Sequence, residues 1–67
     1  MNIRKRRESL GLSQEELGRL AGVSYATISR LERGLRVPQK STLAAIENAL
    51  ERVEEQAWVA SAMKEVE

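Results

Sequence analysis

The sequence contains no cysteine, histidine, phenylalanine or aspartate, and only one proline, one tryptophan and one tyrosine among its 67 residues. Without cysteine no disulfide can form, and without cysteine or histidine the usual ligands of a structural metal site are missing. A general acid or base would have to be glutamate, lysine or tyrosine, and the glutamates fall at helix-capping or solvent positions. The composition therefore argues against an enzyme and predicts neither a metal nor a cofactor.

Long hydrophobic runs are also missing. No apolar run approaches the roughly 20 residues of a membrane span, and Met1 leads directly into a basic segment without the apolar core of a signal peptide. We therefore expect a cytoplasmic protein with no membrane contact, and the lack of cysteine is compatible with a reducing compartment. The length predicts a single domain, residues 1–67, that buries only about 60% of its unfolded surface. A second copy would stabilise such a small domain.

The net charge of +1 conceals an uneven distribution of charge. Residues 1–40 hold nine Lys or Arg and four Glu, a net charge of +5, whereas residues 41–67 hold two Lys or Arg and six Glu, a net charge of −4. This division favours one face that meets a polyanion and another that avoids it. A solvated mixture of charges is the alternative.

The stretch Gln14–Arg33 has the pattern of two helices joined by a sharp turn. Apolar residues recur at intervals of three and four in two runs, Leu17, Leu20 and Ala21 and then Ile28 and Leu31. This spacing places each run on one face of a helix. Two helices joined in this way fit a DNA-binding helix-turn-helix, and a small helical bundle that uses the same angle for packing alone is the alternative.

Capping and small residues mark the ends of these two helices. Ser13, followed three residues later by Glu16, is a capping box that starts the first helix. Gly22 supplies the left-handed conformation that ends it, and Ser24 is placed to N-cap the second helix. Gly18 weakens the first helix by roughly 0.5–1 kcal/mol relative to alanine, so we expect a close contact with the second helix at this position.

Weaker signals place the flanking elements. Ile3 and Leu10, seven residues apart, predict one more helix, over about residues 2–9, which precedes the two helices of this pair. The pair therefore forms the second and third helices of the chain. After Gly34 the stretch LRVPQKS is typical of a loop, in which Pro38 biases the preceding residue toward an extended conformation.

Ser41 or Thr42 is expected to cap a fourth helix, and a fifth helix is expected to cover about residues 52–66. The fourth closes the core with Leu43, Ile46, Ala49 and Leu50. The fifth continues this stripe through Val53, Ala57 and Ala60. A second apolar set on another side of the same helix comprises Trp58, Val59, Ala62, Met63 and Val66. A monomer needs only one such face, so this set predicts a homodimer interface anchored by Trp58. The alternative is that the end of the chain wraps the domain or frays.

The run LGLSQEELGRLAGVSYATISRLERG from Leu10 to Gly34, continued by Pro38 and by LAAIENAL from Leu43 to Leu50, is similar to the phage repressor and Cro-like helix-turn-helix family, also called the XRE family. The likeness covers roughly residues 3–50 and leaves residues 51–67 as a C-terminal helix. It implies a compact, all-α, five-helix, repressor-like domain whose helices 2 and 3 form the helix-turn-helix.

The resemblance also assigns roles to individual residues. Arg7 matches an arginine that pairs with the glutamate matching Glu32, and contact of Arg7 with DNA is the alternative. Tyr25, Ala26 and Arg30 match base-reading positions of the third helix, which covers about residues 24–33. Arg30 can form two parallel hydrogen bonds with guanine, whereas packing of Tyr25 at the domain edge is the alternative. The best-known phage members carry glutamines at the first two of these positions, so the operator sequence stays open.

Other polar residues are expected to contact the DNA backbone, which sets affinity and register rather than sequence. They are Gln14, Ser24, Thr27, Ser29, Arg33, Arg36 and Lys40. Gln14 in particular matches a phosphate anchor that also braces the third helix, and the positive end of the helix dipole suits an anion there.

Together these features predict a sequence-specific transcriptional regulator, a repressor that binds double-stranded DNA as a homodimer. Two recognition helices about 34 Å apart would enter successive major grooves of an inverted repeat. Two alternatives keep the fold: an antitoxin-type DNA-binding protein with a toxin partner, and an adaptor that binds another protein without reading DNA. The salt dependence of binding distinguishes the adaptor from a DNA-binding protein.

Overall fold

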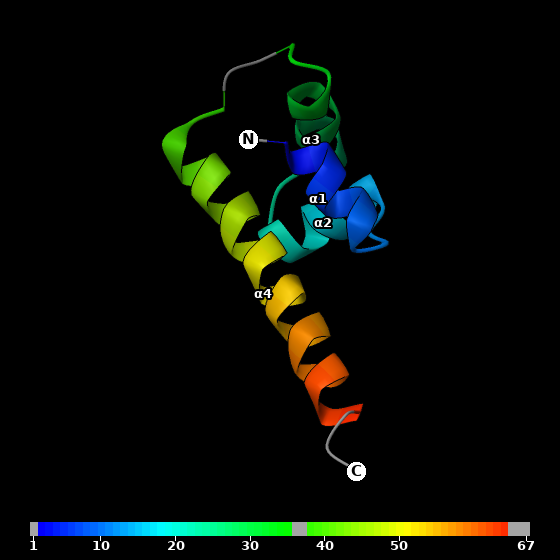
Figure 1. Cartoon of the computed structure of the whole chain (residues 1–67). Coiled ribbons are helices and arrows are strands. Elements are labelled where there is room, and N and C mark those ends of the chain that lie inside the picture. Colours follow the sequence, from blue (N-terminus) through cyan, green and yellow to red (C-terminus); the bar gives the residue numbers. More distant parts are fainter. Residues whose placement is uncertain (1, 36–37, 65–67) are drawn as a thin grey trace.

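The computed structural model describes residues 2–35 and 38–64, which form four helices and no strand. These are α1 (Ile3–Ser9), α2 (Gln14–Ala21), α3 (Tyr25–Glu32) and α4 (Lys40–Lys64). The three short helices gather beside the first half of α4, and the second half of α4 projects away from them (Figure 1). None of the helices in this part of the chain combines the length and the apolar character needed to cross a membrane.

Local capping explains where α1 and α2 begin and end. The side chain of Asn2 accepts a hydrogen bond from the Lys5 amide at 3.0 Å and so caps α1. At α2, Ser13 Oγ accepts from the Glu16 amide and Glu16 Oε1 accepts from the Ser13 amide, each at 3.0 Å. This is the predicted capping box. Gly22 ends α2 at a φ of 71°, the left-handed conformation that the sequence predicts.

The turn between α2 and α3 brings the two helices close together. A Cβ atom added to Gly18 would lie 2.8 Å from the backbone oxygen of Val23 and 3.5 Å from the Tyr25 amide nitrogen. The close contact predicted at Gly18 is therefore present, and it is made with the backbone of the turn and the start of α3. Ser24 caps α3 as predicted, since its Oγ accepts from the Thr27 amide at 3.2 Å.

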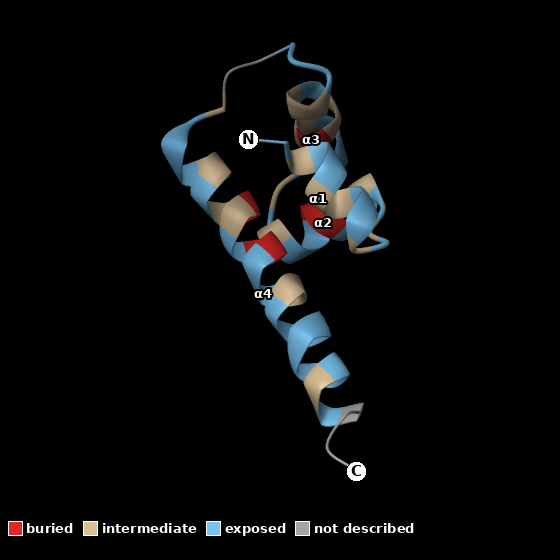
Figure 2. Ribbon diagram, viewed as in Figure 1, coloured by how far each residue is buried: buried red, intermediate tan, exposed pale blue. Residues whose placement is uncertain are grey.

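The core lies where α2, α3 and the first half of α4 meet (Figure 2). Its fully buried residues are Leu17, Ile28, Ile46, Ala49 and Leu50. Six partly buried residues surround them, namely Ile3, Leu10, Leu12, Ala21, Val23 and Leu31. Because α2 packs against both α3 and α4, it fixes the position of α3 relative to the rest of the molecule.

Leu20 does not belong to this core, although its spacing from Leu17 predicts that it should. It is 44% exposed. Leu20 is the penultimate residue of α2, close to the point where α4 leaves the packed helices, and its carbonyl oxygen accepts a hydrogen bond from Arg52 at 3.3 Å. Ala21, the next residue of the stripe, packs against the core, so Leu20 lies on a side of α2 that its neighbours leave uncovered.

The prediction of five helices is wrong, because the expected fourth and fifth helices form one 25-residue helix, α4. No glycine or proline interrupts this span, and its Ala, Glu, Leu, Arg and Gln residues favour helix. The predicted cap at Ser41 or Thr42 is also wrong, because α4 already begins at Lys40. The Leu43 amide donates to the carbonyl of Gln39 at 2.9 Å and so closes the first turn.

The length of α4 has a further consequence. Ala57 and Ala60, predicted to continue the core stripe, are exposed. Val53 and Glu54 are the last residues before a run from Glu55 to Ser61 in which every residue is exposed. The packed helices thus cover α4 only as far as Glu54.

Candidate nucleic-acid interface

The residues of α3 that are predicted to read bases are turned to solvent. Tyr25 is 55% exposed, and Ala26 and Arg30 are exposed on the same helix. Ile28, on the opposite side, is fully buried in the core. Ala26 and Arg30, four residues apart, therefore share one exposed side of α3. Tyr25 is exposed at the N-terminal end of α3, where it borders a hollow with Glu15, Arg19 and Val23 of α2 and the turn.

The C-terminal end of α3 is fixed by an ion pair with α1. Glu32, whose side chain is 3% exposed, accepts hydrogen bonds from Arg7 Nε at 2.7 Å and from Arg7 Nη2 at 3.0 Å. Arg7 Nη1 also donates to the carbonyl of Leu12 at 2.7 Å. The pair predicted between Arg7 and Glu32 is thus present, and it ties α1, the connection to α2 and α3 to one another.

Gln14 completes this network from the first turn of α2. Its Nε2 donates to Glu32 Oε1 at 3.0 Å, so Gln14 braces the end of α3 as the sequence predicts. Burial of Glu32 acts to raise the pKa of its carboxyl group, but the hydrogen bonds from Arg7 and Gln14 outweigh burial and hold this pKa below its ordinary value. The hydrogen bonds to Glu32 also raise the pKa of Arg7, so both groups are charged at neutral pH.

The N-terminal end of α3 presents two hydroxyl groups. Ser24 Oγ lies 2.8 Å from Thr27 Oγ1 and also accepts from the Thr27 amide. Both residues are predicted to lie near the DNA backbone, and in the structure they bond to each other. Ser24 is exposed and Thr27 is half-buried. Ser29, another predicted backbone contact, is half-buried one turn further along.

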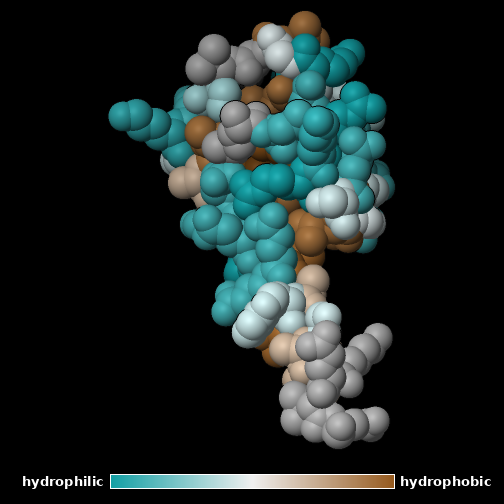
Figure 3. All heavy atoms as spheres, viewed as in Figure 1, coloured by the Kyte–Doolittle hydropathy of each residue, from teal (hydrophilic) through white to brown (hydrophobic). Residues whose placement is uncertain are grey.

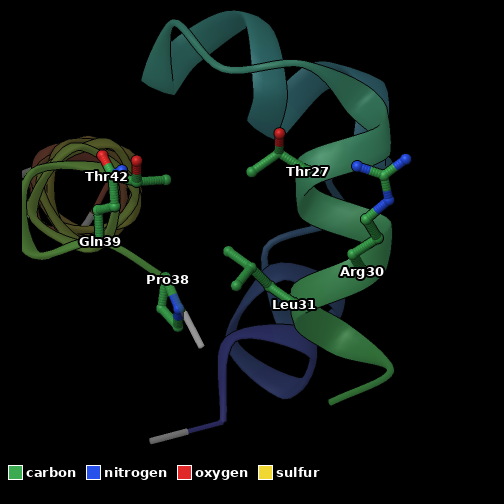
Figure 4. A pocket seen from close by; sticks show the side chains of 6 residues that line it. All are labelled: Thr27, Arg30, Leu31, Pro38, Gln39 and Thr42. Atoms are coloured by element: carbon green, nitrogen blue, oxygen red, sulfur yellow. The ribbon is translucent and has the colours of Figure 1, made fainter. Parts of the chain in front are cut away.

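A hollow of about 190 Å³ separates α3 from the beginning of α4 (Figure 4). It is lined by Thr27, Arg30, Leu31, Pro38, Gln39 and Thr42. Thr27 and Leu31 point from α3 toward Thr42 and Gln39, whereas the guanidinium group of Arg30 points away from α4. The end of the Arg30 side chain is therefore directed outward from the domain.

The remaining predicted backbone contacts flank the loop between α3 and α4. Arg33 is the exposed C-cap of α3, and Lys40 is exposed at the first position of α4 rather than within the loop where the sequence places it. Arg36 lies outside the described residues. Arg33 and Lys40 thus place two positive charges at the ends of the elements that border the exposed face of α3.

The chain matches the family model described as Helix-turn-helix over residues 3–58. It belongs to the XRE-type helix-turn-helix family. The match covers α1 to α3 and continues into α4 as far as residue 58, further than the end near residue 50 that the sequence motifs predict.

Three curated relatives are similar to this helix-turn-helix chain. One is from Mycobacterium bovis and two are from Mycobacterium tuberculosis, and each is named an uncharacterized HTH-type transcriptional regulator. Each is 48% identical over 48 residues, which cover 72% of this chain and 19% of the relative. The chain therefore spans about a fifth of the length of these relatives. No solved structure gives a significant match.

A second ion-pair network in this helix-turn-helix protein escapes prediction from the sequence. Arg6 donates from Nε to Glu54 Oε2 at 3.2 Å and from Nη2 to Glu54 Oε1 at 2.7 Å, while its Nη1 bonds to Glu47. These bonds, with Glu54 first, raise the pKa of Arg6, and they hold the pKa of Glu54 below its ordinary value. The available signal was the spacing of Glu47 and Glu54, seven residues apart on one face of α4, opposite a basic run in α1.

The residues predicted to form a dimer interface lie on the projecting half of α4. Trp58 is 71% exposed, Met63 70% and Val59 41%, and Ala62 is half-buried. Val66 falls outside the described residues. Figure 3 shows hydrophobic surface at the base of this projection. Val59 and Met63 also border a shallow hollow of about 370 Å³ together with Arg52, Glu55, Gln56 and Ala60.

Proposed function

We propose that this chain is a sequence-specific DNA-binding transcriptional regulator that inserts α3 into the major groove. The observation that carries the proposal is the division of α3 into two faces. Ile28 and Glu32 fix one face to the core and to Arg7, while Ala26 and Arg30 stand exposed on the other. A recognition helix needs this arrangement, because its base-reading residues must be held firmly and still reach the bases.

In this proposal Tyr25, Ala26 and Arg30 contact the bases. Arg30 donates two parallel hydrogen bonds to O6 and N7 of a guanine, and the Ala26 methyl group lies against a thymine methyl group. The outward direction of Arg30 supports this role.

The backbone contacts proposed around this helix set affinity and register. They are made by Gln14, Ser24, Thr27, Ser29, Arg33, Arg36 and Lys40. The exposure of Arg33 and Lys40 on either side of the loop supports two of them directly. Gln14 would reach a phosphate from the N-terminus of α2 while it braces Glu32.

The proposal includes a homodimer that represses by covering a promoter. Two copies related by a two-fold axis would place their α3 helices about 34 Å apart on an inverted repeat. The apolar face of α4 formed by Trp58, Val59, Ala62 and Met63, with Val66 beyond the described part, is the proposed contact between copies. The high exposure of Trp58 and Met63 supports it, because aromatic residues and methionine are typical of buried interface centres.

The same exposed face favours one alternative, in which α4 binds a different protein, as in an antitoxin held by its toxin. In that case the chain still reads DNA through α3. An adaptor that does not read DNA is the third possibility, and it is distinguished by salt. Phosphate contacts make log affinity fall linearly with log salt concentration, whereas an apolar protein interface does not.

Selection of bound sequences from random duplex DNA tests the proposal. The native protein, Arg30→Ala and the charge-matched control Arg4→Ala are compared, because Arg4 lies on α1 and pairs with Glu8 on its own helix at 3.3 Å. We expect the native protein and the control to enrich one inverted repeat. Arg30→Ala should lose preference at one guanine in each half-site, an effect of about 1–3 kcal/mol. No enrichment by folded native protein would contradict DNA reading.

A further inference from the structure

Along α4, the change from residues that contact the other helices to fully exposed residues occurs within one helical turn. Val53 and Glu54 are half-buried, and every residue from Glu55 to Ser61 is exposed. Figure 2 shows this change along α4, from mixed burial beside the other helices to exposed surface beyond them. The direction of the projecting half must therefore be fixed by contacts at or before Glu54.

Arg6 makes the strongest polar contact at this point. Its guanidinium group binds both oxygens of Glu54 and one oxygen of Glu47, two turns earlier on the same helix. The three donors hold α4 at two places along its axis, so they restrict its tilt as well as its distance from α1. The Arg6 and Glu47 side chains are each 29% exposed and that of Glu54 is 39% exposed, so solvent screens the pairs in part.

A second polar contact holds α4 from another side. Arg52 Nη2 donates to the carbonyl oxygen of Leu20 at the end of α2, at 3.3 Å. Leu50 is the last fully buried residue of α4. Beyond Leu50, within the part of the chain that the structure describes, the polar contacts of α4 with the other helices are two bonds from Arg6 to Glu54 and one from Arg52 to the end of α2.

A small tilt at Glu54 has a large effect further along the helix. Met63 lies nine residues beyond Glu54, about 14 Å at 1.5 Å per residue. A tilt of about 15° therefore moves Met63 by about 3.5 Å relative to α3, roughly the rise of one base pair along DNA. An interface on this segment transmits such a tilt to the separation of the two α3 helices.

We propose that Arg6 is a positioning residue that fixes the direction of the projecting half of α4 and thereby sets the half-site spacing that the dimer accepts. This inference rests on the proposed function, since it needs a dimer formed through α4 and an inverted-repeat operator. Arg6 itself contacts no base in this scheme. Arg6 affects only the distance between half-sites that the dimer prefers, whereas Arg30 affects which base is preferred within each half-site.

A distance measurement within one copy tests the positioning step without DNA. The chain has no cysteine, so Glu15→Cys on α2 and Ser61→Cys on α4, both exposed, accept a pair of spin labels. Labelled protein is diluted into unlabelled protein so that only distances within a copy are recorded. We expect Arg6→Gln and Glu54→Gln to broaden the distance distribution or shift it by about 3 Å. The control Arg4→Gln, on the same helix, should leave it unchanged.

Binding to a panel of duplexes tests the consequence. The duplexes carry identical half-sites whose centres are one base pair closer, at the preferred spacing, or one base pair further apart. We expect the affinity ratio between preferred and altered spacing to fall about three- to tenfold in Arg6→Gln and less in Glu47→Gln, with base preference within each half unchanged. General destabilisation would weaken all duplexes equally and leave the ratio as in the native protein.

The outcomes separate the two proposals. If folded Arg6→Gln and Glu54→Gln keep the native distance distribution and spacing ratio, Arg6 does not position α4, and the proposed function stands. If the native protein shows no dimer or no preferred spacing, the proposed function fails in that respect and the spacing role of Arg6 fails with it.

Discussion

The packed part of the molecule and the projecting half of α4 differ in how completely their side chains are satisfied. Within residues 2–35 and 38–64, every buried side-chain nitrogen or oxygen has a hydrogen-bond partner, and the core residues are fully enclosed. Beyond Glu54 the same helix carries Trp58 and Met63 with about 70% of their surface exposed. The first half of this continuous helix thus contributes buried residues to the core, whereas the second half carries exposed apolar side chains that the fold of a single copy does not bury. Substitutions in the two regions should therefore change different measured quantities.

The largest loss of stability is expected in the packed part, from Glu32→Ala. This change leaves the half-buried Arg7 guanidinium without its carboxylate partner, and the cost approaches the roughly 3–5 kcal/mol of breaking a fully buried pair. A domain of this size has a free energy of unfolding of only about 3–10 kcal/mol. We therefore expect the variant to be largely unfolded at room temperature, as measured by helical circular dichroism and urea titration.

The double variant Arg7→Met with Glu32→Leu is the matched control, because it removes both charges and leaves neither unpaired. It should recover much of the lost stability, as buried pairs replaced by apolar residues commonly do. A Glu32→Ala variant as stable as the native protein would show that the pair contributes nothing to the fold.

A smaller loss is expected from Gly18→Ala. The added Cβ would lie 2.8 Å from the backbone oxygen of Val23, which cannot move without opening the turn. The strain costs about 1–3 kcal/mol, and the helix-propensity gain of about 0.5–1 kcal/mol offsets only part of it. Urea titration measures the difference. Arg19→Ala, on the exposed side of the same helix, should change stability by less than about 0.5 kcal/mol, and an equal effect of both variants would contradict the close contact.

The features predicted correctly from the sequence are those that depend on a few neighbouring residues. The capping box at Ser13, the left-handed Gly22 and the N-cap Ser24 each act within one turn, so their residue types identify them. The pair of Arg7 with Glu32 spans 25 residues, and it is the family resemblance, not spacing, that predicts it. The assignment of Tyr25, Ala26 and Arg30 to bases stays a prediction.

The features that were missed depend on how far one element extends past another. Whether α4 breaks near residue 51 is not decided by its apolar pattern, because two apolar faces fit one long helix as well as two short ones. The exposure of Leu20 depends on where α4 leaves α2, and the partners of Arg6 depend on the direction of α4. Each is a long-range consequence of packing that no local residue pattern encodes.

Protonation of Glu32 at low pH should lower the free energy of unfolding of the packed part. The loss should be smaller than that in Glu32→Ala, because a protonated carboxyl group still accepts hydrogen bonds. The pKa of Glu32 is lower in the folded chain than its ordinary value of 4.5. Its contribution to stability is therefore complete above pH 4.5 and is lost as the pH falls through the folded value. The difference in unfolding free energy between native protein and Glu32→Gln should shrink as the pH is lowered from 5 toward 3.

Comparison with Glu32→Gln isolates this residue, because Glu16 and Glu54, whose pKa values are also lowered, titrate in both proteins. A difference that stays constant with pH would show that Glu32 and Arg7 are not coupled by charge.

The smallest effect on the packed part is expected from Trp58→Ala, which should instead change association. Trp58 is 71% exposed, so its removal should alter the unfolding free energy of the dissociated chain by less than about 0.5 kcal/mol. If α4 pairs two copies, light scattering should show a lower apparent mass for this variant than for the native protein. The melting temperature should also lose its dependence on protein concentration. Ser61→Ala, exposed on the same segment, is the control and should retain both properties. An unchanged mass would exclude Trp58 as the anchor of a dimer, and a large loss of stability in dilute solution would place its side chain against its own domain.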